Sequence, residues 1–297
     1  MKTLALWTLT GWLMLFSVSS TAQCATEQVS AADAVSEADN VSEADDVSEA
    51  DDVSEADDVP ETNDAANPAV SAEDLVAGAL DLVRGRTSYA ELSMVIHRPD
   101  WERTSSLVSW TRGREDALIR FTAPARDAGN ATLKQGDKMW TYTPKLNRTI
   151  RLPYSLMSQS WAGSDFSYND LSRTDDLLRH YQLTIVETRE ADGHSVYTVE
   201  AIPHDDAPVV WGKEEWVLRD DYVLISQTFY DQSMEALKQL VTLTIGELGG
   251  RVMPLRMRMS KLDEPENYTE VLYEHADFDI EIEDRTFTVF SLQSGGR

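Results

Sequence analysis

The spacing of hydrophobic residues predicts one helix near the start of the folded region. From Ser71 to Arg84, apolar residues recur every three or four positions, which is the spacing of a helix with one buried face. Ser71 is a favoured N-cap residue, Asp74 stands where a capping box needs a return contact, and Gly85 is a common helix terminator. We therefore expect a helix over residues 71–84.

Beyond the helix, apolar and polar residues alternate. Leu92, Met94 and Ile96 fall on one side of a two-residue repeat, as expected of a strand with one buried face. Further runs of this kind follow, joined in places by turn pairs typical of hairpins, such as Asp192-Gly193 and Gly249-Gly250. The further strands are expected at residues 102–110, 115–122, 137–143, 147–152, 181–189, 194–202, 213–219, 222–230, 237–247, 251–262 and 267–276.

This succession of strands predicts a large antiparallel sheet, because parallel strands would need helices between them. A sheet of that size must curl or close. The expected fold class is therefore mainly β with some α: a curved antiparallel sheet. The alternation lapses between Pro153 and Tyr181, where residues 171–180 could form a short helix.

The first 22 residues have the order of a secretory signal peptide. Lys2 is followed by an apolar run and then by small residues that end at Ala22. The run is about fifteen residues long, shorter than the roughly twenty that span a bilayer. We expect export with cleavage after Ala22. One alternative is that the segment is retained as a membrane anchor. The other is a lipid on Cys24, but Gln23 stands where a bacterial lipoprotein needs a small residue.

Residues 23–70 form a second compositional region, with fifteen acids and neither lysine nor arginine. Four near-identical hexads occupy residues 35–58. Because like charges repel and little apolar surface is available for burial, we expect an acidic disordered spacer. A tail that binds calcium or a cationic partner is the alternative. Residues 71–297 then form the folded domain, with 37 acids against 25 bases.

Charge and motifs exclude several functions. The formal charge of −26 argues against nucleic acid, whose phosphates need clustered lysine and arginine. With Cys24 as its single cysteine, the chain has no intramolecular disulfide. The sequence has no nucleophile elbow, phosphate-binding loop or histidine pair at metal-ligand spacing. We therefore predict no catalytic residue, metal or cofactor, and a hydrolase is the weakest hypothesis.

Residues 139–171, which read MWTYTPKLNRTIRLPYSLMSQSWAGSDFSYNDL, resemble the outer-membrane lipoprotein-sorting proteins, the LolA-like group, in residue type, order and spacing. The capped helix and the segments 117–121 and 284–287 agree with the same family, so the resemblance covers residues 71–297. It implies an incomplete β-barrel whose apolar concave face is covered by short helices. It also implies a periplasmic protein that holds acyl chains of lipoproteins, or other lipids.

Such a carrier needs an apolar interior, because burying fifteen methylenes is worth on the order of 12 kcal/mol. Trp161 and Phe166 lie in the irregular segment, where they would either be exposed on a lid or docking surface or plug the mouth of the barrel. The other candidates lie on predicted strands and include methionines, whose side chains adapt well to flexible acyl chains. The alternative is that these residues fill an ordinary protein core and leave no space for a ligand. We expect the interior to be lined by Leu92, Met94, Ile96, Trp140, Tyr142, Met253, Leu255 and Met257.

The leading hypothesis is a periplasmic carrier whose lid helices occupy the empty cavity and are displaced by the ligand. Arg148 and Arg151 are predicted to pair with Asp165 and Asp170, holding the irregular segment against the sheet. Release would need a receptor, for example in the outer membrane, or a transporter partner. The resemblance also implies an accessory role beside an inner-membrane transporter of the RND or MMPL type, from which the protein would take its cargo. The alternative is a secreted interaction module with a filled barrel and an acidic partner-binding tail.

Overall fold

The computed structural model describes residues 70–172 and 176–294. All of the described residues belong to one compact unit of the chain. The predicted signal peptide, and the predicted spacer up to residue 69, lie outside the described residues. Among the helices that are described, none is long and apolar enough to cross a membrane.

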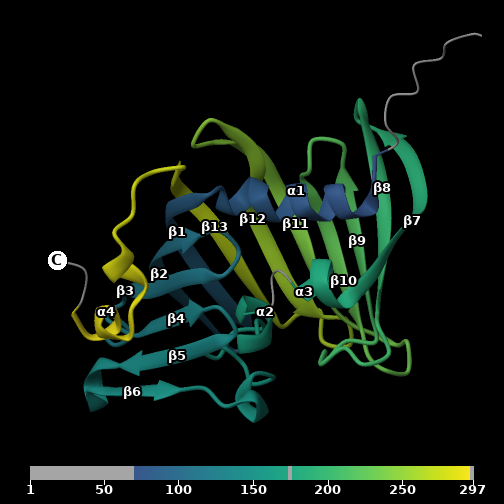
Figure 1. Ribbon diagram of the computed structural model, residues 1–297. Coiled ribbons are helices and arrows are strands. Elements are labelled where there is room, and N and C mark those ends of the chain that lie inside the picture. Colours follow the sequence, from purple (N-terminus) through teal and green to yellow (C-terminus); the bar gives the residue numbers. More distant parts are fainter. Residues whose placement is uncertain (1–69, 173–175, 295–297) are drawn as a thin grey trace, which may run out of the picture. The chain divides into compact units, whose positions relative to one another are not determined.

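Strands make up most of the described chain (Figure 1). The strands are β1 (Thr87–Arg98), β2 (Trp101–Arg112), β3 (Asp116–Ala123), β4 (Ala131–Gln135), β5 (Lys138–Thr143), β6 (Arg148–Arg151), β7 (Tyr181–Ala191), β8 (His194–Pro203), β9 (Lys213–Arg219), β10 (Leu224–Tyr230), β11 (Ala236–Leu248), β12 (Arg251–Lys261) and β13 (Tyr268–Phe278). The helices are α1 (Ala72–Arg84), α2 (Tyr168–Ser172), α3 (Asp176–His180) and α4 (Val289–Ser294), with 3₁₀ turns η1 (Pro144–Leu146), η2 (Tyr154–Leu156) and η3 (Asp284–Phe287).

All thirteen described strands form one antiparallel sheet, which is curved but not closed. The order across the sheet is β6-β5-β4-β3-β2-β1-β13-β12-β11-β10-β9-β8-β7, so β6 and β7 are its edges. Pairing of β1 with β13 joins the first and the last described strands in the middle of the sheet. The predicted fold class, a curved antiparallel sheet with short helices, is confirmed.

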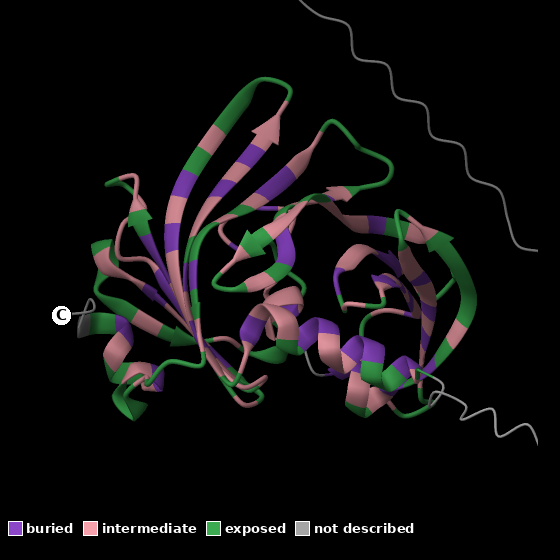
Figure 2. Cartoon of the chain, turned by 90° about the horizontal axis from the view of Figure 1, so that it is seen from above, coloured by how far each residue is buried: buried purple, intermediate pink, exposed green. Residues whose placement is uncertain are grey.

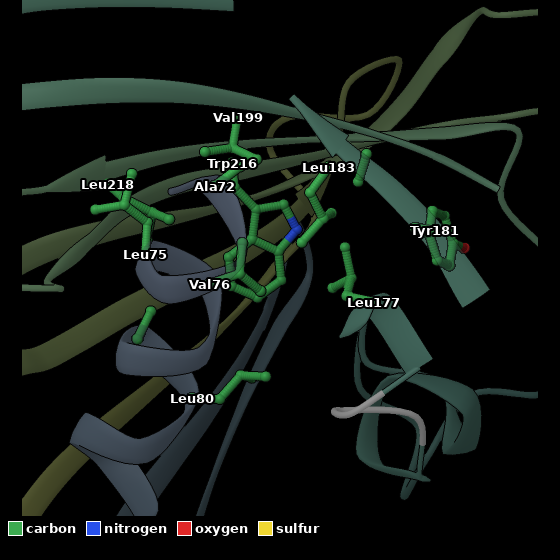
Figure 3. Packing of buried hydrophobic residues seen from close by; sticks show 12 residues of the cluster. Ala72, Leu75, Val76, Leu80, Leu177, Tyr181, Leu183, Val199, Trp216 and Leu218 are labelled. Carbon is green, nitrogen blue, oxygen red and sulfur yellow. The ribbon is translucent and has the colours of Figure 1, made fainter. Parts of the chain in front are cut away.

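Helix α1 begins as its sequence predicts. The Ser71 hydroxyl oxygen accepts a hydrogen bond from the backbone N–H of Asp74 at 3.0 Å, and Gly85 ends the helix with a φ of 59°. The buried side chains Leu75 and Val76 pack on β7, β8 and β9. Figure 3 shows Trp216 of β9 at the centre of this contact. Burial of this apolar stripe attaches the helix to one half of the sheet.

The N-cap of α1 gives a first test. We expect Ser71→Ala to lower the free energy of unfolding by about 1 kcal/mol, because the Asp74 N–H loses its acceptor. Urea denaturation measures the change. Ser155→Ala, at an exposed position, is the matched control and should change stability by less than about 0.5 kcal/mol. Equal effects of the two substitutions would show that the cap does not stabilise the helix.

Paired residues define two faces of the sheet, because directly opposed residues point to the same side. We call the face that contacts α1 the inner face. Buried residues alternate with more exposed ones along most strands (Figure 2). Through the pairs Met94–Val271 and Met257–Val271, the inner face continues from β1 to β12. The opposite, outer face is covered over β3, β4 and β5 by η3 and α4, through Phe287 and Leu292.

Strand β4 was not predicted, and its burial explains why. The four residues from Ala131 to Lys134 are all buried, because the strand has cover on both faces. Alternation of apolar and polar residues marks a strand only where one face meets solvent. The predicted helix at residues 171–180 corresponds to α2, which begins earlier, and to α3.

Candidate functional site

Residues 153–172, called the cover segment, run from β6 over the inner face and contain η2 and α2. Trp161 is only 5% exposed and packs against Met94, Ile96 and Phe121, with 5.4 Å between the Trp161 and Phe121 ring centroids. Its indole N–H donates to Thr132 Oγ1 at 3.0 Å. Exposure of Trp161 on a lid is therefore wrong, and the alternative that it plugs the mouth of the barrel stays a prediction.

Two ion pairs attach the cover segment to the sheet. Arg98, at the end of β1, lies 3.0 Å from Asp165, which also accepts the Thr269 hydroxyl at 2.7 Å. Lys238 of β11 lies 2.6 Å from Asp170 of α2, and these two side chains are 10% and 7% exposed. Because both carboxylates are largely removed from water, each depends on its cation.

The predicted partners of these carboxylates are wrong. Arg148 and Arg151 are exposed in β6, at the open edge of the sheet. Asp165 and Asp170 instead lie over the middle of the sheet, where Arg98 and Lys238 reach them. Proximity in sequence favoured the arginines, but the return of the chain across the sheet decides the pairing.

A cavity of about 160 Å³ lies between the cover segment, α1, α3 and the inner face of β9 to β12. We call it the central cavity. Two more open depressions share lining residues with it: one of about 740 Å³ that includes Asp176, and one of about 360 Å³ that includes Phe166. The apolar walls of the central cavity include Phe166, Leu177, Val209, Trp211, Phe229 and Leu240.

One wall of the central cavity is polar, around Glu214 of β9. Gln227 Nε2 and Trp216 Nε1 both donate to Glu214 Oε2, at 2.8 and 3.1 Å. Burial raises the pKa of the Glu214 carboxyl to about 7, although these two hydrogen bonds act to lower it. Glu214 therefore changes between its neutral and charged forms near physiological pH.

Two cavity residues of α2 have unsatisfied oxygens. Asn169 is 6% exposed, and within the described chain its Oδ1 is buried without a hydrogen-bond partner. Asp170 Oδ2 binds Lys238, but Asp170 Oδ1 is likewise buried without a partner among the described residues. Unsatisfied buried oxygens are costly, so a site that keeps them is a candidate for ligand contact.

The structure describes all ten predicted ligand-binding residues and places them in different parts of the fold. Leu92, Met94 and Ile96 of β1 lie on the inner face, together with Met253, Leu255 and Met257 of β12. Phe166 lines the central cavity, and it is alone among the ten in doing so.

Trp140 and Tyr142 of β5 lie on the other side of the sheet. Trp140 pairs with Leu133 and Tyr142 with Ala131, and this group packs against η3 and α4 on the outer face. Placing these two aromatics in the interior is therefore wrong. The sheet separates them from the central cavity.

The polar wall was missed, although the sequence contains a signal for it. Glu214 lies on the same side of its strand as the apolar residues Trp216 and Leu218, and Lys238 lies on the same side of its strand as Leu240. A charged residue on the apolar side of a strand is unusual enough to mark a buried polar site.

One cluster in the described residues has metal-ligand types, namely His194, Asp220 and Asp221. Arg219 Nη2 lies 2.6 Å from Asp221 Oδ2 and 2.5 Å from His194 Nε2. Arg219 pairs with Asp221, and His194 Nδ1 lies 2.6 Å from Asp220 Oδ1, so we interpret the cluster as a network of ion pairs and hydrogen bonds and assign no metal to it.

A family model described as an uncharacterized protein matches residues 113–294, more than half of the chain. No curated protein matches. Among solved structures, a DUF1329 family protein from Desulfovibrio piger has a TM-score of 0.67 at 23% identity, covering 75% of this chain and 98% of that one.

Two further structures cover 75% of this chain and 100% of their own. One is a putative outer membrane lipoprotein-sorting protein domain from Vibrio parahaemolyticus, with a TM-score of 0.64 at 22% identity. The other is a LolA superfamily protein from Nitrosomonas europaea, with a TM-score of 0.63 at 20% identity. The chain therefore belongs to the family of uncharacterized proteins matched over residues 113–294, and its fold is LolA-like, as its sequence predicted.

Proposed function

We propose that this protein is a non-catalytic periplasmic carrier that holds the hydrocarbon part of a lipid or lipid-modified protein against the inner face of its sheet. The central cavity carries the proposal: its walls are largely apolar, and it lies beneath a segment attached by two ion pairs. A few convergent polar groups in an apolar pocket are typical of ligand sites. The LolA-like fold, shared with a putative lipoprotein-sorting domain, supports the same function.

The volume of the cavity determines how a long chain would bind. About 160 Å³ is close to the size of an engineered cavity of roughly 150 Å³ that binds benzene. A longer chain must therefore extend into the neighbouring depressions or displace the cover segment. Each buried methylene contributes about 0.8 kcal/mol, which would offset the free energy needed to detach the cover segment from the sheet. Ligand binding and opening are then linked, because the ligand favours the open state.

The rest of the proposal concerns transport. Export by the signal peptide would place the carrier in the periplasm, where acyl chains must cross water between two membranes. An inner-membrane transporter of the RND or MMPL type would supply the cargo, or an outer-membrane receptor would accept it. Either partner would act by stabilising the conformation that releases the ligand.

A second candidate function is an interaction module with a filled barrel. Close packing of Trp161 on Met94 and Ile96 favours it, since this half of the inner face is occupied by the protein's own side chains. In that case the sheet would be a rigid scaffold, and partners would bind its surface. Binding of a neutral hydrocarbon ligand separates the two functions.

We expect purified full-length protein to bind 1-decanol with one site, measured by isothermal titration calorimetry. Leu240→Asn places an amide in the apolar wall, so it should weaken binding about tenfold, or about 1.4 kcal/mol. Leu243→Asn, at an exposed position of the same strand, should change affinity less than twofold. Circular dichroism checks that both variants fold. No heat of binding to wild-type protein would favour the interaction module.

A further inference from the structure

Three residues that line the central cavity each carry an acceptor oxygen that has no donor among the described residues. They belong to Asn169, Asp170 and Glu214, which we call the acceptor cluster. Asn169 Oδ1 and Asp170 Oδ1 are buried and have no hydrogen-bond partner in residues 70–172 and 176–294, where both hydrogen bonds to Glu214 end on Oε2. Among the described residues no hydrogen bond ends on Glu214 Oε1. A ligand that satisfies this cluster must bring several donors.

The charges favour a cation. Asp170 is already neutralised by Lys238, whereas the hydrogen-bond partners of Glu214 are the neutral side chains of Gln227 and Trp216. Once ionised, Glu214 therefore lacks a counter-ion in direct contact. Burial makes that charge costly, so an incoming cation would gain from neutralising it.

Aromatic rings in the same cavity are suited to a cation as well. The Lys238 ammonium already lies 4.9 Å from the Trp211 ring centroid and 4.6 Å from that of Phe229. Ring faces attract cations within about 6 Å, and most strongly where water is excluded. Trp216 and Phe166 add two more rings to the lining.

We propose that the acceptor cluster binds the primary ammonium group of an amphiphilic amine, with the hydrocarbon chain lying along the apolar walls. This inference rests on the proposed function, because it assigns the head group of the ligand in the same cavity. An ammonium offers three donors and no acceptor, which suits three unpaired acceptor oxygens. A hydroxyl offers one donor. An ionised carboxylate offers none and would be repelled by Glu214.

Three ten-carbon probes test the head group: decylamine, 1-decanol and decanoate, titrated into full-length protein at pH 8 in 0.3 M NaCl. The salt screens attraction between the amine and the acidic surface of the chain. We expect decylamine to bind at least tenfold more tightly than decanol, and decanoate to bind most weakly. If decanol binds but decylamine has no advantage, the inference is overturned and the carrier function stands. If none of the three binds, the carrier function fails and the inference fails with it.

Substitutions then locate the head group. Glu214→Gln removes the charge and should reduce the preference for decylamine over decanol to less than threefold. Glu215→Gln, the adjacent acid on the outer face of β9, should leave the preference intact. Asn169→Ala, which removes one acceptor, should lower decylamine affinity several-fold and serves as the test should Glu214→Gln not fold. A preference unchanged in both cavity variants would overturn the assignment.

Discussion

Replacing Lys238 with methionine is expected to lower the free energy of unfolding by about 3–5 kcal/mol, because it leaves the Asp170 carboxylate buried without its cation. Nζ of Lys238 lies 2.6 Å from Asp170 Oδ2, and the positive charge also lowers the pKa of Glu214. A single substitution thus removes the counter-ion of one buried acid and a weaker, longer-range attraction to a second. Urea denaturation at pH 8, followed by circular dichroism, measures the loss.

A double variant shows whether the buried charge is the cause. Lys238→Met combined with Asp170→Asn should recover most of the stability, since replacing both partners of a buried pair with neutral groups is often tolerated. The new amide oxygen can still accept the Ser167 N–H, which Asp170 Oδ2 accepts at 2.7 Å. Arg285→Met, in an exposed pair with Glu283, should cost less than about 1 kcal/mol. A loss in Lys238→Met no greater than that control would contradict the role given to the pair.

The fold followed from the sequence wherever one face of an element meets solvent. Helix α1 shows both its cap and its apolar stripe, and strands such as β1 and β9 alternate clearly. Strand β4 lacks alternation because the cover segment and the C-terminal helix bury it from opposite sides. Burial on both faces removes the periodic signal that a sequence can show.

The site was harder to predict, because alternation separates two faces without saying which one is inner. Trp140 and Tyr142 alternate as core residues should, but the partner that buries them is α4, nearly 150 residues later in the chain. The ion-pair partners of the cover segment pose the same problem, since Arg98 and Lys238 reach it through the sheet order. Such contacts are set by the path of the chain across the sheet, and local patterns do not record them.

Glu214 combines a buried charge with a place in the cavity wall, so its effect on stability depends on pH. The folded chain holds the Glu214 proton up to a pKa of about 7, because burial disfavours the carboxylate. In the unfolded chain a glutamate has a pKa of about 4.3. Between these two values the folded state keeps a proton that the unfolded state has lost. The contribution of Glu214 to stability therefore falls as pH rises through this window, and the loss is complete above about pH 7.

Glu214→Gln should remove this pH-dependent loss. The amide stays neutral, and its oxygen can accept the hydrogen bonds from Gln227 and Trp216. We expect wild type and variant to be similarly stable near pH 4.5, and the variant to be about 3 kcal/mol more stable at pH 8, from the difference in pKa between the two states. Urea denaturation at pH 4.5, 6 and 8 measures the difference, and Glu215→Gln, on the outer face, should show no comparable trend. If the stability difference between Glu214→Gln and wild type is the same at all three pH values, then the pKa of Glu214 is the same in the folded and unfolded chains, and burial does not disfavour its carboxylate.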